Sequence, residues 1–415
     1  MLLLTAALLA SGCNPVAAPT RSSLDLHELD SPTGPGAALP HLATRDQVAL
    51  LSWVEPTGNG HRLNYARYAD GGWGTGAVVA SGTGWFVNWA DFPAVVPIDS
   101  SRFVAHWLVR SGESTYAYDI AIATSVDAGR TWREQGPPHG DGTKTEHGFV
   151  TAVPASTGAV IVWLDGRHTG TSAHDHDGGT AAAAGTMSLA TAALDEQWEL
   201  TQDEIVDTAV CDCCQTDAVT TREGVIVVYR DRDPVTERRD IALLRHVDGQ
   251  WSEPVAVHED GWILRGCPVN GPAIDARDDD VAVAWFTAAG GTPRVRIAFS
   301  QDGGRSFGPP SDVDEGAPHG RVDTVLLPDG SALVSWLADG RDGAALTIAR
   351  VRSDGTIDAR WPIATSSAAR SAGFPQMSRV DDTLLIAWTE DRSPSRIRTF
   401  AARLDPAWVD GTASR

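Results

Sequence analysis

The sequence predicts an all-β protein, a β-propeller of six or seven four-stranded blades, because two kinds of segment repeat along its 415 residues. A short apolar run that ends in an aromatic residue recurs seven times, with the aromatics 51 to 66 residues apart. The runs are VALLSW (Trp53), RFVAHW (Trp107), AVIVW (Trp163), VIVVY (Tyr229), VAVAW (Trp285), ALVSW (Trp336) and LLIAW (Trp388). Each run is short, rich in β-branched residues and bounded by turn residues, as buried strands are. A unit of roughly fifty residues has room for four short strands, which make one propeller blade.

A second segment begins 14 to 18 residues before each aromatic and opens on a similar pair of residues. The pairs are Leu39-Pro40, Phe92-Pro93, His147-Gly148, Cys214-Gln215, Cys267-Pro268, His319-Gly320 and Phe374-Pro375. The innermost strand of each propeller blade lines the central channel, so we expect the seven opening residues to share one rim of that channel. The repeats place the propeller at residues 39–405, with a C-terminal tail at 406–415.

Two of the seven units carry the same turn motif after the apolar run. Residues 125–132 read SVDAGRTW, and residues 300–307 read SQDGGRSF. In such a turn the Asp side chain accepts hydrogen bonds from nearby amides, Gly adopts a positive φ and the aromatic packs into the blade. The motif resembles the Asp-box of the sialidase (BNR-repeat) superfamily, which forms a hairpin between the two outer strands of a blade. The structural residues that this resemblance implies are Asp127, Gly129, Trp132, Asp302, Gly304 and Phe307.

The resemblance to sialidases does not extend to their catalytic motifs. Sialidases carry the first of three substrate-binding arginines in a Phe/Tyr-Arg-Ile-Pro motif, whereas this chain has Ala37-Ala38-Leu39-Pro40 there. Sialidases also use a Tyr nucleophile late in the chain, but the last of the five tyrosines here is Tyr229. We therefore expect a non-hydrolytic protein and assign no catalytic residue. The alternative is an exo-α-sialidase or related glycoside hydrolase that uses a different carboxylate pair.

Four consecutive units open on residue types that bind soft or borderline metals: His147, Cys214, Cys267 and His319. Cys211 and Cys213 lie beside them in the stretch CDCCQT. These six residues predict a transition-metal site at the channel mouth. Copper is the first interpretation and zinc the second, because thiolates and imidazoles suit both metals. No nucleotide cofactor is expected.

Other interpretations of the four cysteines remain open. An even number of cysteines in an exported domain is typical of disulfides, and Cys214 to Cys267 would link adjacent blades. Reactive redox thiols are a third interpretation. A disulfide-stabilised propeller would act as a scaffold for a protein or glycan ligand at the propeller face. A His- and Asp-rich loop in the third unit offers further metal ligands, or is a solvated acidic loop; its histidines are His168, His174 and His176.

Arginines recur after an aspartate in the loops that return to the same rim. Those arginines are Arg167, Arg232, Arg341 and Arg392, and Arg265 precedes the Gly-Cys-Pro of the fifth unit. We interpret them first as salt bridges that hold loops and neighbouring blades, and second as contacts to a ligand at the rim.

Charge and the N-terminal residues bear on location and partners. The net charge of −21 argues against nucleic acid and anionic membrane surfaces as partners.

Residues 1–13, MLLLTAALLASGC, resemble a bacterial lipoprotein signal, with Cys13 as the acylated residue; the alternative is an apolar N-terminus without a targeting role. Residues 14–38 are rich in Pro, Gly, Ser and Ala and predict a flexible tether. We therefore expect a periplasmic or outer-membrane lipoprotein that contacts the membrane only through its lipid.

Overall fold

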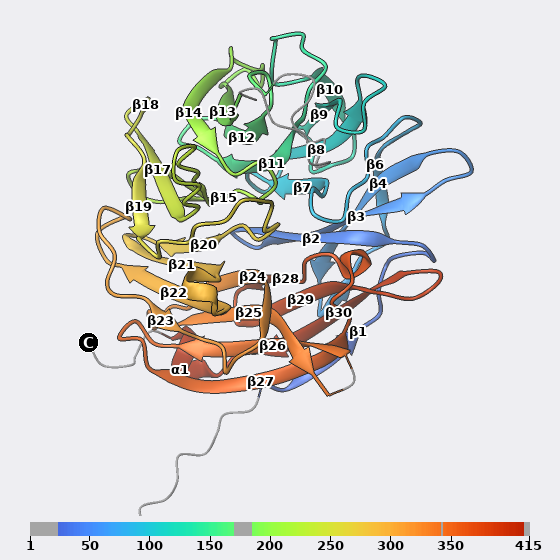
Figure 1. Ribbon diagram of the computed structural model, residues 1–415. Coiled ribbons are helices and arrows are strands. Elements are labelled where there is room, and N and C mark those ends of the chain that lie inside the picture. The colour runs from blue at the N-terminus through green and yellow to red at the C-terminus, as the bar shows by residue number, and fades with distance from the viewer. Residues whose placement is uncertain (1–23, 170–184, 342, 411–415) are drawn as a thin grey trace, which may run out of the picture.

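Seven separate antiparallel sheets are arranged in a ring in the computed structural model, which describes residues 24–169, 185–341 and 343–410 (Figure 1). Five sheets have four strands, and two have five because a short extra strand pairs with the third strand of the blade. The fold is therefore a seven-bladed β-propeller. This confirms the all-β, sialidase-like architecture and settles the blade number at the count of repeat units.

The blades follow one another along the chain, and each of the first six uses consecutive strands. Blades one and two comprise β2 (Ala38–Arg45), β3 (Val48–Pro56), β4 (His61–Ala69), β5 (Gly72–Trp73) and β6 (Ala77–Gly82), then β7 (Ala94–Pro97), β8 (Phe103–Arg110), β9 (Tyr118–Ser125) and β10 (Arg133–Gly136). Blades three and four comprise β11 (His147–Pro154), β12 (Ala159–Asp165), β13 (Met187–Leu194) and β14 (Glu204–Val210), then β15 (Asp217–Thr220), β16 (Gly224–Arg230), β17 (Ile241–Val247), β18 (Gln250–Trp251) and β19 (Val255–His258). Blades five and six comprise β20 (Ala273–Arg277), β21 (Asp280–Thr287), β22 (Arg294–Ser300) and β23 (Ser311–Asp312), then β24 (Pro318–Leu326), β25 (Ala332–Gly340), β26 (Gly343–Val351) and β27 (Ile357–Ser366). Blade seven comprises β28 (Gln376–Val380), β29 (Thr383–Glu390), β30 (Arg396–Arg403) and, from the N-terminal side, β1 (Leu26–Leu29).

The first strand of each blade faces the centre of the ring. Residues of all seven first strands line a central cavity of about 530 Å³. The seven repeated aromatics lie on the second strands, and all are buried; Trp163, Trp285 and Tyr229 have no exposed surface. Each second strand is apolar along most of its length because both faces pack against neighbouring blades.

The two predicted Asp-boxes form the hairpins between the third and fourth strands of blades two and five. Asp127 Oδ1 accepts the backbone N–H of Thr131 at 2.9 Å, and Asp302 makes the same bond to the N–H of Ser306 at 2.9 Å. Gly129 has φ +83°, and a Cβ there would meet Tyr65 Oη at 2.0 Å, so a larger residue does not fit. In both turns the aspartate thus holds the hairpin through hydrogen bonds within the motif.

Strand β1 closes the ring by pairing with β30 along the outer edge of blade seven (Figure 1). It falls inside residues 14–38, so the range expected to be a tether contains a structural strand. Leu29 at its end is 7% exposed and packs in the core with residues of blades one and seven. The propeller thus begins before residue 39, and the fourth strand of blade seven comes from the opposite end of the chain.

Helices are few and short in the described ranges. They are the 3₁₀ turns Ala289–Gly291 and Arg370–Ala372 and the single turn α1 (Pro406–Val409). Trp408 of α1 is buried in the core of blades six and seven, so the expected tail contributes to packing. None of these described helices has the length and apolar character needed to cross a membrane.

Candidate functional site

The opening residues of the seven units lie where the first strands begin, so they share one end of the channel. They are Leu39, Phe92, His147, Cys214, Cys267, His319 and Phe374. Three aromatic rings form an apolar group at this end, because Trp89 and Phe92 pack on Phe374 with ring centroids 5.7 and 6.1 Å apart. The sequence predicts one ring of polar opening residues, but the structure divides them into separate groups.

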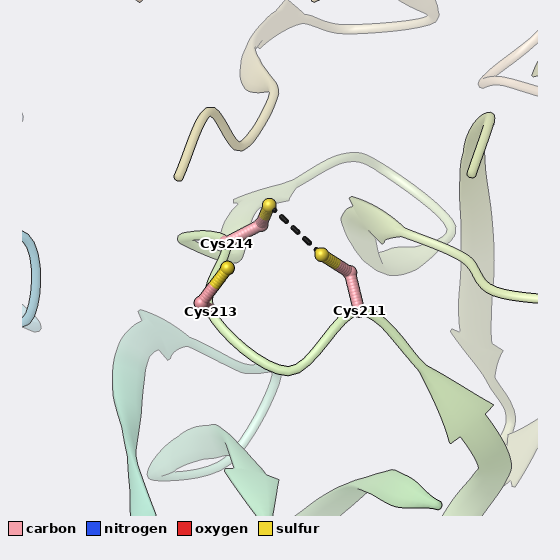
Figure 2. A group of neighbouring side chains, drawn as sticks. All are labelled: Cys211, Cys213 and Cys214. Carbon is pink, nitrogen blue, oxygen red and sulfur yellow. Dashed lines mark hydrogen bonds between the residues drawn. The ribbon is translucent and has the colours of Figure 1, made fainter. Parts of the chain in front are cut away.

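Three cysteines from the turn between blades three and four form a thiol cluster (Figure 2). The Sγ atoms of Cys211, Cys213 and Cys214 all lie within 4.8 Å of one another, and those of Cys211 and Cys214 are 3.1 Å apart. Cys211 and Cys214 are 1% and 2% exposed. The cluster is anchored because the Cys211 backbone N–H donates to the carbonyl of Arg230 on β16 at 2.9 Å.

Cys267, from the loop before β20, extends this cluster toward blade five. Its thiol interacts with that of Cys213, whereas its residue is exposed to solvent. All four cysteines are free thiols in the structure. Cys211 and Cys214 are thus buried, Cys213 is half-buried and Cys267 is exposed.

Two buried arginines surround the thiol cluster. Arg239 is 2% exposed, and its Nη1 donates to Cys211 Sγ at 3.2 Å. Arg230 is 1% exposed and is held by hydrogen bonds to three backbone carbonyls, those of Arg239, Asn270 and Phe286. These contacts fix two positive charges beside the sulfurs, which favours the thiolate form.

The three thiols differ in acidity. Burial acts to raise the pKa of Cys211, but hydrogen bonds from the thiols of Cys213 and Cys214 and the charge of Arg239 outweigh it and hold the pKa well below its ordinary value. The pKa of Cys213 is raised by its hydrogen bonds to Cys211 and the other thiols, and that of Cys214 is raised first by burial. Among the three cysteines, Cys211 is therefore the one whose surroundings most favour ionisation.

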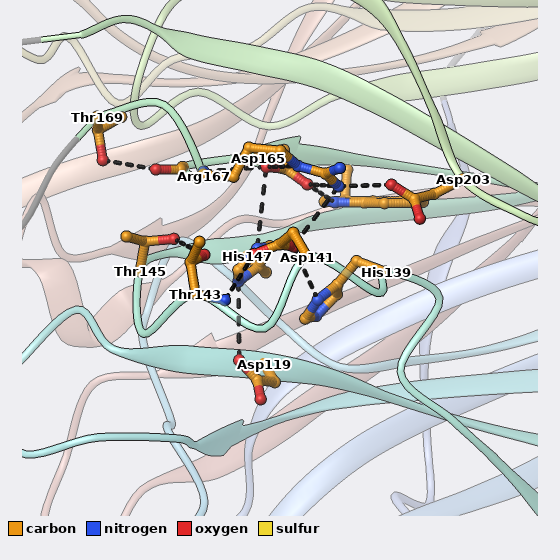
Figure 3. Close-up of polar contacts among 12 residues, drawn as sticks. Asp119, His139, Asp141, Thr143, Thr145, His147, Asp165, Arg167, Thr169 and Asp203 are labelled. Carbon is orange, nitrogen blue, oxygen red and sulfur yellow. Dashed lines mark hydrogen bonds and ion pairs between the residues drawn. The ribbon is translucent and has the colours of Figure 1, made fainter.

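The predicted histidine ligands do not join the thiols. His147 is fully buried and belongs to a separate His–Asp cluster between blades two and three (Figure 3). His319 is half-buried, and its Nε2 lies 2.9 Å from Asp339 Oδ1. His168 is exposed on the loop after β12. His174 and His176, like Cys13, lie outside the described residues.

Three of the rim arginines form ion pairs with nearby carboxylates. Arg167 pairs with Asp165 at 2.7 Å and with Asp203 at 2.6 Å. Arg232 lies 2.9 Å from Glu237 and 3.2 Å from Asp212, which ties the turn of the thiol cluster to the loop after β16. Arg392 makes a longer pair, 3.6 Å, with Glu390. The two remaining arginines, Arg265 and Arg341, form no ion pair in the part of the chain that the structure describes.

A buried tyrosine, Tyr118, contacts two carboxylates, as the nucleophilic tyrosine of a hydrolase contacts its activating glutamate. Tyr118 Oη donates to Glu146 Oε1 at 2.6 Å and lies 3.3 Å from Asp91 Oδ2. The tyrosine is 1% exposed and is stacked on Phe86 with ring centroids 4.0 Å apart. Burial raises the pKa of Asp91 to about 8. Tyr118 and Glu146 are buried, and Asp91 is the member of this group that lines the central cavity.

Sequence reasoning did not select Arg239, His139 or Asp119. Arg239 is 28 residues from Cys211 in sequence and contacts it from the loop between β16 and β17. The arginine-rich segment after Tyr229 was a signal for charge near the thiols, and the spacing of His139 and His147 around Asp141 was a signal for a second ligand group.

Comparisons with known proteins identify the fold. No family model matches the chain, and no curated protein matches it. An ulvan lyase of polysaccharide lyase family PL25, bound to -[GlcA(1-4)Rha3S]-, is similar with a TM-score of 0.55 and 11% identity over 91% of this chain and 96% of that one. The polysaccharide lyase Uly1 is similar with a TM-score of 0.54 and 10% identity over 88% and 90% of the two chains. A sialidase from Trypanosoma rangeli matches 79% of this chain and 56% of its own, with a TM-score of 0.49 and 12% identity. At these identities the comparisons establish a propeller and no activity.

Proposed function

We propose that this protein binds a thiophilic metal ion, Cu(I), at the cluster of Cys211, Cys213 and Cys214. The observation that carries the proposal is the convergence of three free sulfurs within 4.8 Å of one another in one turn, two of them on buried residues. Metal–sulfur bonds of about 2.3 Å place the sulfurs of a trigonal site about 4 Å apart, so small side-chain rotations would suit these thiols to one ion. Soft thiolate ligands favour Cu(I).

The arrangement supports copper over zinc. A structural zinc site has four ligands in a tetrahedron, and the two histidines expected to complete such a set lie in other contacts. Cys267 is not part of the group of three converging sulfurs and is exposed to solvent. A monovalent soft ion held by three thiolates needs no fourth ligand from the protein.

Charge also supports a thiolate-rich centre. One monovalent ion with three thiolates carries net negative charge, which is costly to bury without a counter-charge. Arg239 and Arg230 supply two buried positive charges at this place, and one of them contacts Cys211 directly. In this proposal the arginines stabilise the metal centre, and Cys267 serves as the exposed thiol through which an ion enters or leaves.

The proposal includes export. Residues 1–13 would direct lipidation at Cys13, and the chain between Cys13 and β1 would tether the propeller to a membrane. Incorporation of a radiolabelled fatty acid in cells, compared with a Cys13→Ser variant, tests this part by itself. Label that persists in the variant would contradict lipidation at Cys13. This result would not bear on the metal site, so the two parts of the proposal are tested independently.

Native mass spectrometry of residues 24–415, purified anaerobically without chelator and then given Cu(I), tests the metal site. We expect one copper per chain, lost in Cys211→Ser and in Cys214→Ser and retained in Cys267→Ser. A protein that takes up no copper and has the mass deficit of two disulfides would overturn the proposal in favour of a disulfide-stabilised scaffold. Activity toward a fluorogenic sialoside would favour the glycosidase alternative.

A further inference from the structure

A second group of metal-binding side chains lies between blades two and three, away from the thiols (Figure 3). Asp119 is on β9, His147 opens β11, and His139 is on the loop between β10 and β11. A parallel bridge between Tyr118 and Glu146 places Asp119 and His147, the next residue on each segment, side by side. The backbone therefore fixes these ligand types next to one another.

One carboxylate orients both imidazoles. His147 Nε2 hydrogen-bonds Asp141 Oδ2 at 3.1 Å, and His139 Nδ1 faces the same oxygen at 3.4 Å. The two rings are stacked, with centroids 3.8 Å apart and planes 4° from parallel. Because Asp141 is an acceptor, it favours the tautomers with protons on these two nitrogens. The lone pairs then belong to His147 Nδ1 and His139 Nε2, on the other edge of each ring.

Those two nitrogens and one oxygen of Asp119 are buried without a hydrogen-bond partner among the described residues. The three atoms are His147 Nδ1, His139 Nε2 and Asp119 Oδ1. His147 Nδ1 lies 3.7 Å from Asp119 Oδ1, and the three residues each offer a ligand atom within 4.8 Å of the others. Buried polar atoms are rarely left unpaired, because each costs about 1–3 kcal/mol. One partner shared by these three neighbouring residues would satisfy all three atoms.

The opposite edge of the rings is less suited to a cation. There Asp141 and Asp165 face His147 Nε2, but Arg167 lies 2.7 Å from Asp165 and 3.6 Å from Asp141. The guanidinium already neutralises these carboxylates and would repel a metal ion. Asp141 and Arg167 are better placed as the outer residues that orient metal-binding histidines, as carboxylates commonly do.

We propose that Asp119, His139 and His147 bind one divalent transition-metal ion, distinct from the ion at the thiols. Two imidazoles and one carboxylate form the ligand set of open, non-structural Zn²⁺ and Fe²⁺ sites. Each nitrogen lone pair lies in the plane of its ring, so the two stacked rings tilt apart when they share an ion. The side chain of Asp119 is 32% exposed, which gives the site a side open to solvent.

Cobalt(II) is the probe, because its spectrum separates nitrogen and oxygen ligands from sulfur ligands. With the thiols first occupied by Cu(I), we expect one Co²⁺ per chain with visible d–d absorption and no sulfur-to-cobalt charge-transfer band. Proton NMR of this species should show two exchangeable, hyperfine-shifted imidazole N–H signals, from His139 Nδ1–H and His147 Nε2–H. Asp141→Asn should weaken Co²⁺ binding about 10- to 100-fold, since it removes the orienting acceptor.

His147→Gln and Asp119→Asn should each abolish the d–d absorption and both N–H signals. Asp119 is partly exposed, so its variant tests the site even if a change at fully buried His147 prevents folding. His258→Gln is the matched control, because its Nε2 also lies near an aspartate, 3.8 Å from Asp260. Co²⁺ absorption that survives in Asp119→Asn, or cobalt bound only through sulfur, would overturn the proposal without touching the copper site.

Discussion

Arg239 Nη1 donates to Cys211 Sγ at 3.2 Å, and both residues are almost fully buried. A second donor, Arg239 Nε, is held by the carbonyl of Leu264 at 3.1 Å, so the guanidinium is fixed rather than free to follow the sulfur. A fixed charge beside a buried sulfur stabilises the thiolate before any metal arrives. The pKa of Cys211 is therefore lowered by its neighbouring thiols together with a charge fixed on the loop between β16 and β17.

Replacing Arg239 should weaken copper binding without removing a ligand. Hydrogen bonds to charged groups contribute about 1.5–3 kcal/mol, so Arg239→Gln should raise the Cu(I) dissociation constant about 10- to 100-fold. Competition with a chromogenic Cu(I) chelator measures this constant. Arg238→Gln is the matched control, because Arg238 is partly exposed and lies 3.8 Å from Asp240 rather than beside the thiols. Equal affinities in the two variants would argue against a role for the buried charge.

The four cysteines should not be equivalent. Serine at Cys211, Cys213 or Cys214 removes one of the three converging sulfurs, and each variant should lose at least 100-fold in Cu(I) affinity. Cys267→Ser should retain the equilibrium affinity, but copper transfer to an acceptor chelator should slow because the exposed thiol is gone. Stopped-flow transfer experiments and equilibrium competition separate these two effects. A stoichiometric loss of copper in Cys267→Ser would instead make Cys267 a required ligand.

The propeller itself was predictable because its signals are local and repeated. Each second strand contains a buried aromatic, and each Asp-box contains its own hydrogen bonds, such as Asp302 to Ser306. Strand β1 was not predictable from its sequence, because four residues without the repeated aromatic carry too little periodicity to be read as a strand. Its pairing with β30 depends on contacts across almost the whole chain.

The candidate sites were predictable in residue type but not in grouping. Repeat register places His147, Cys214, Cys267 and His319 at one rim, yet it does not specify the direction in which each side chain points. The side chain of His147 instead joins Asp119 and His139, which come from two other segments of the chain. It is therefore not grouped with the thiols. The thiol cluster itself was visible because three of its members lie within four positions of sequence.

Three channel aspartates should make the propeller less stable as the pH rises. Asp217, Asp275 and Asp323 each accept a backbone N–H from the next blade, those of Ile274, Leu326 and Met377. Burial raises the pKa of Asp217 to about 7 and that of Asp275 to about 6, and raises that of Asp323 well above its usual range. The unfolded value is about 3.9, so their protonated forms stabilise the fold fully below about pH 4.

This contribution should be lost as the pH rises from about 4 through about 7, because the folded state must then ionise buried carboxyls. Asp275→Asn should flatten that part of the pH profile while it lowers the free energy of unfolding by about 1 kcal/mol at pH 5, since the amide keeps only one acceptor oxygen. Urea unfolding followed by tryptophan fluorescence between pH 4 and 8 gives both quantities. Asp278→Asn, at an exposed turn, should leave the profile unchanged; a wild-type stability that increases over this range would contradict the assignment.

Removal of β1 should open the ring. Deletion of residues 1–29 takes away the outer strand of blade seven, exposes the edge of β30 and leaves a hole where Leu29 packs. The loss of one buried leucine alone costs about 2–5 kcal/mol, so the free energy of unfolding should fall by at least that amount. The unpaired edge of β30 should also promote self-association, which size-exclusion chromatography detects. The control is deletion of residues 1–23, which keeps β1 whole; if both deletions unfold at the same urea concentration, β1 does not contribute to closing the propeller.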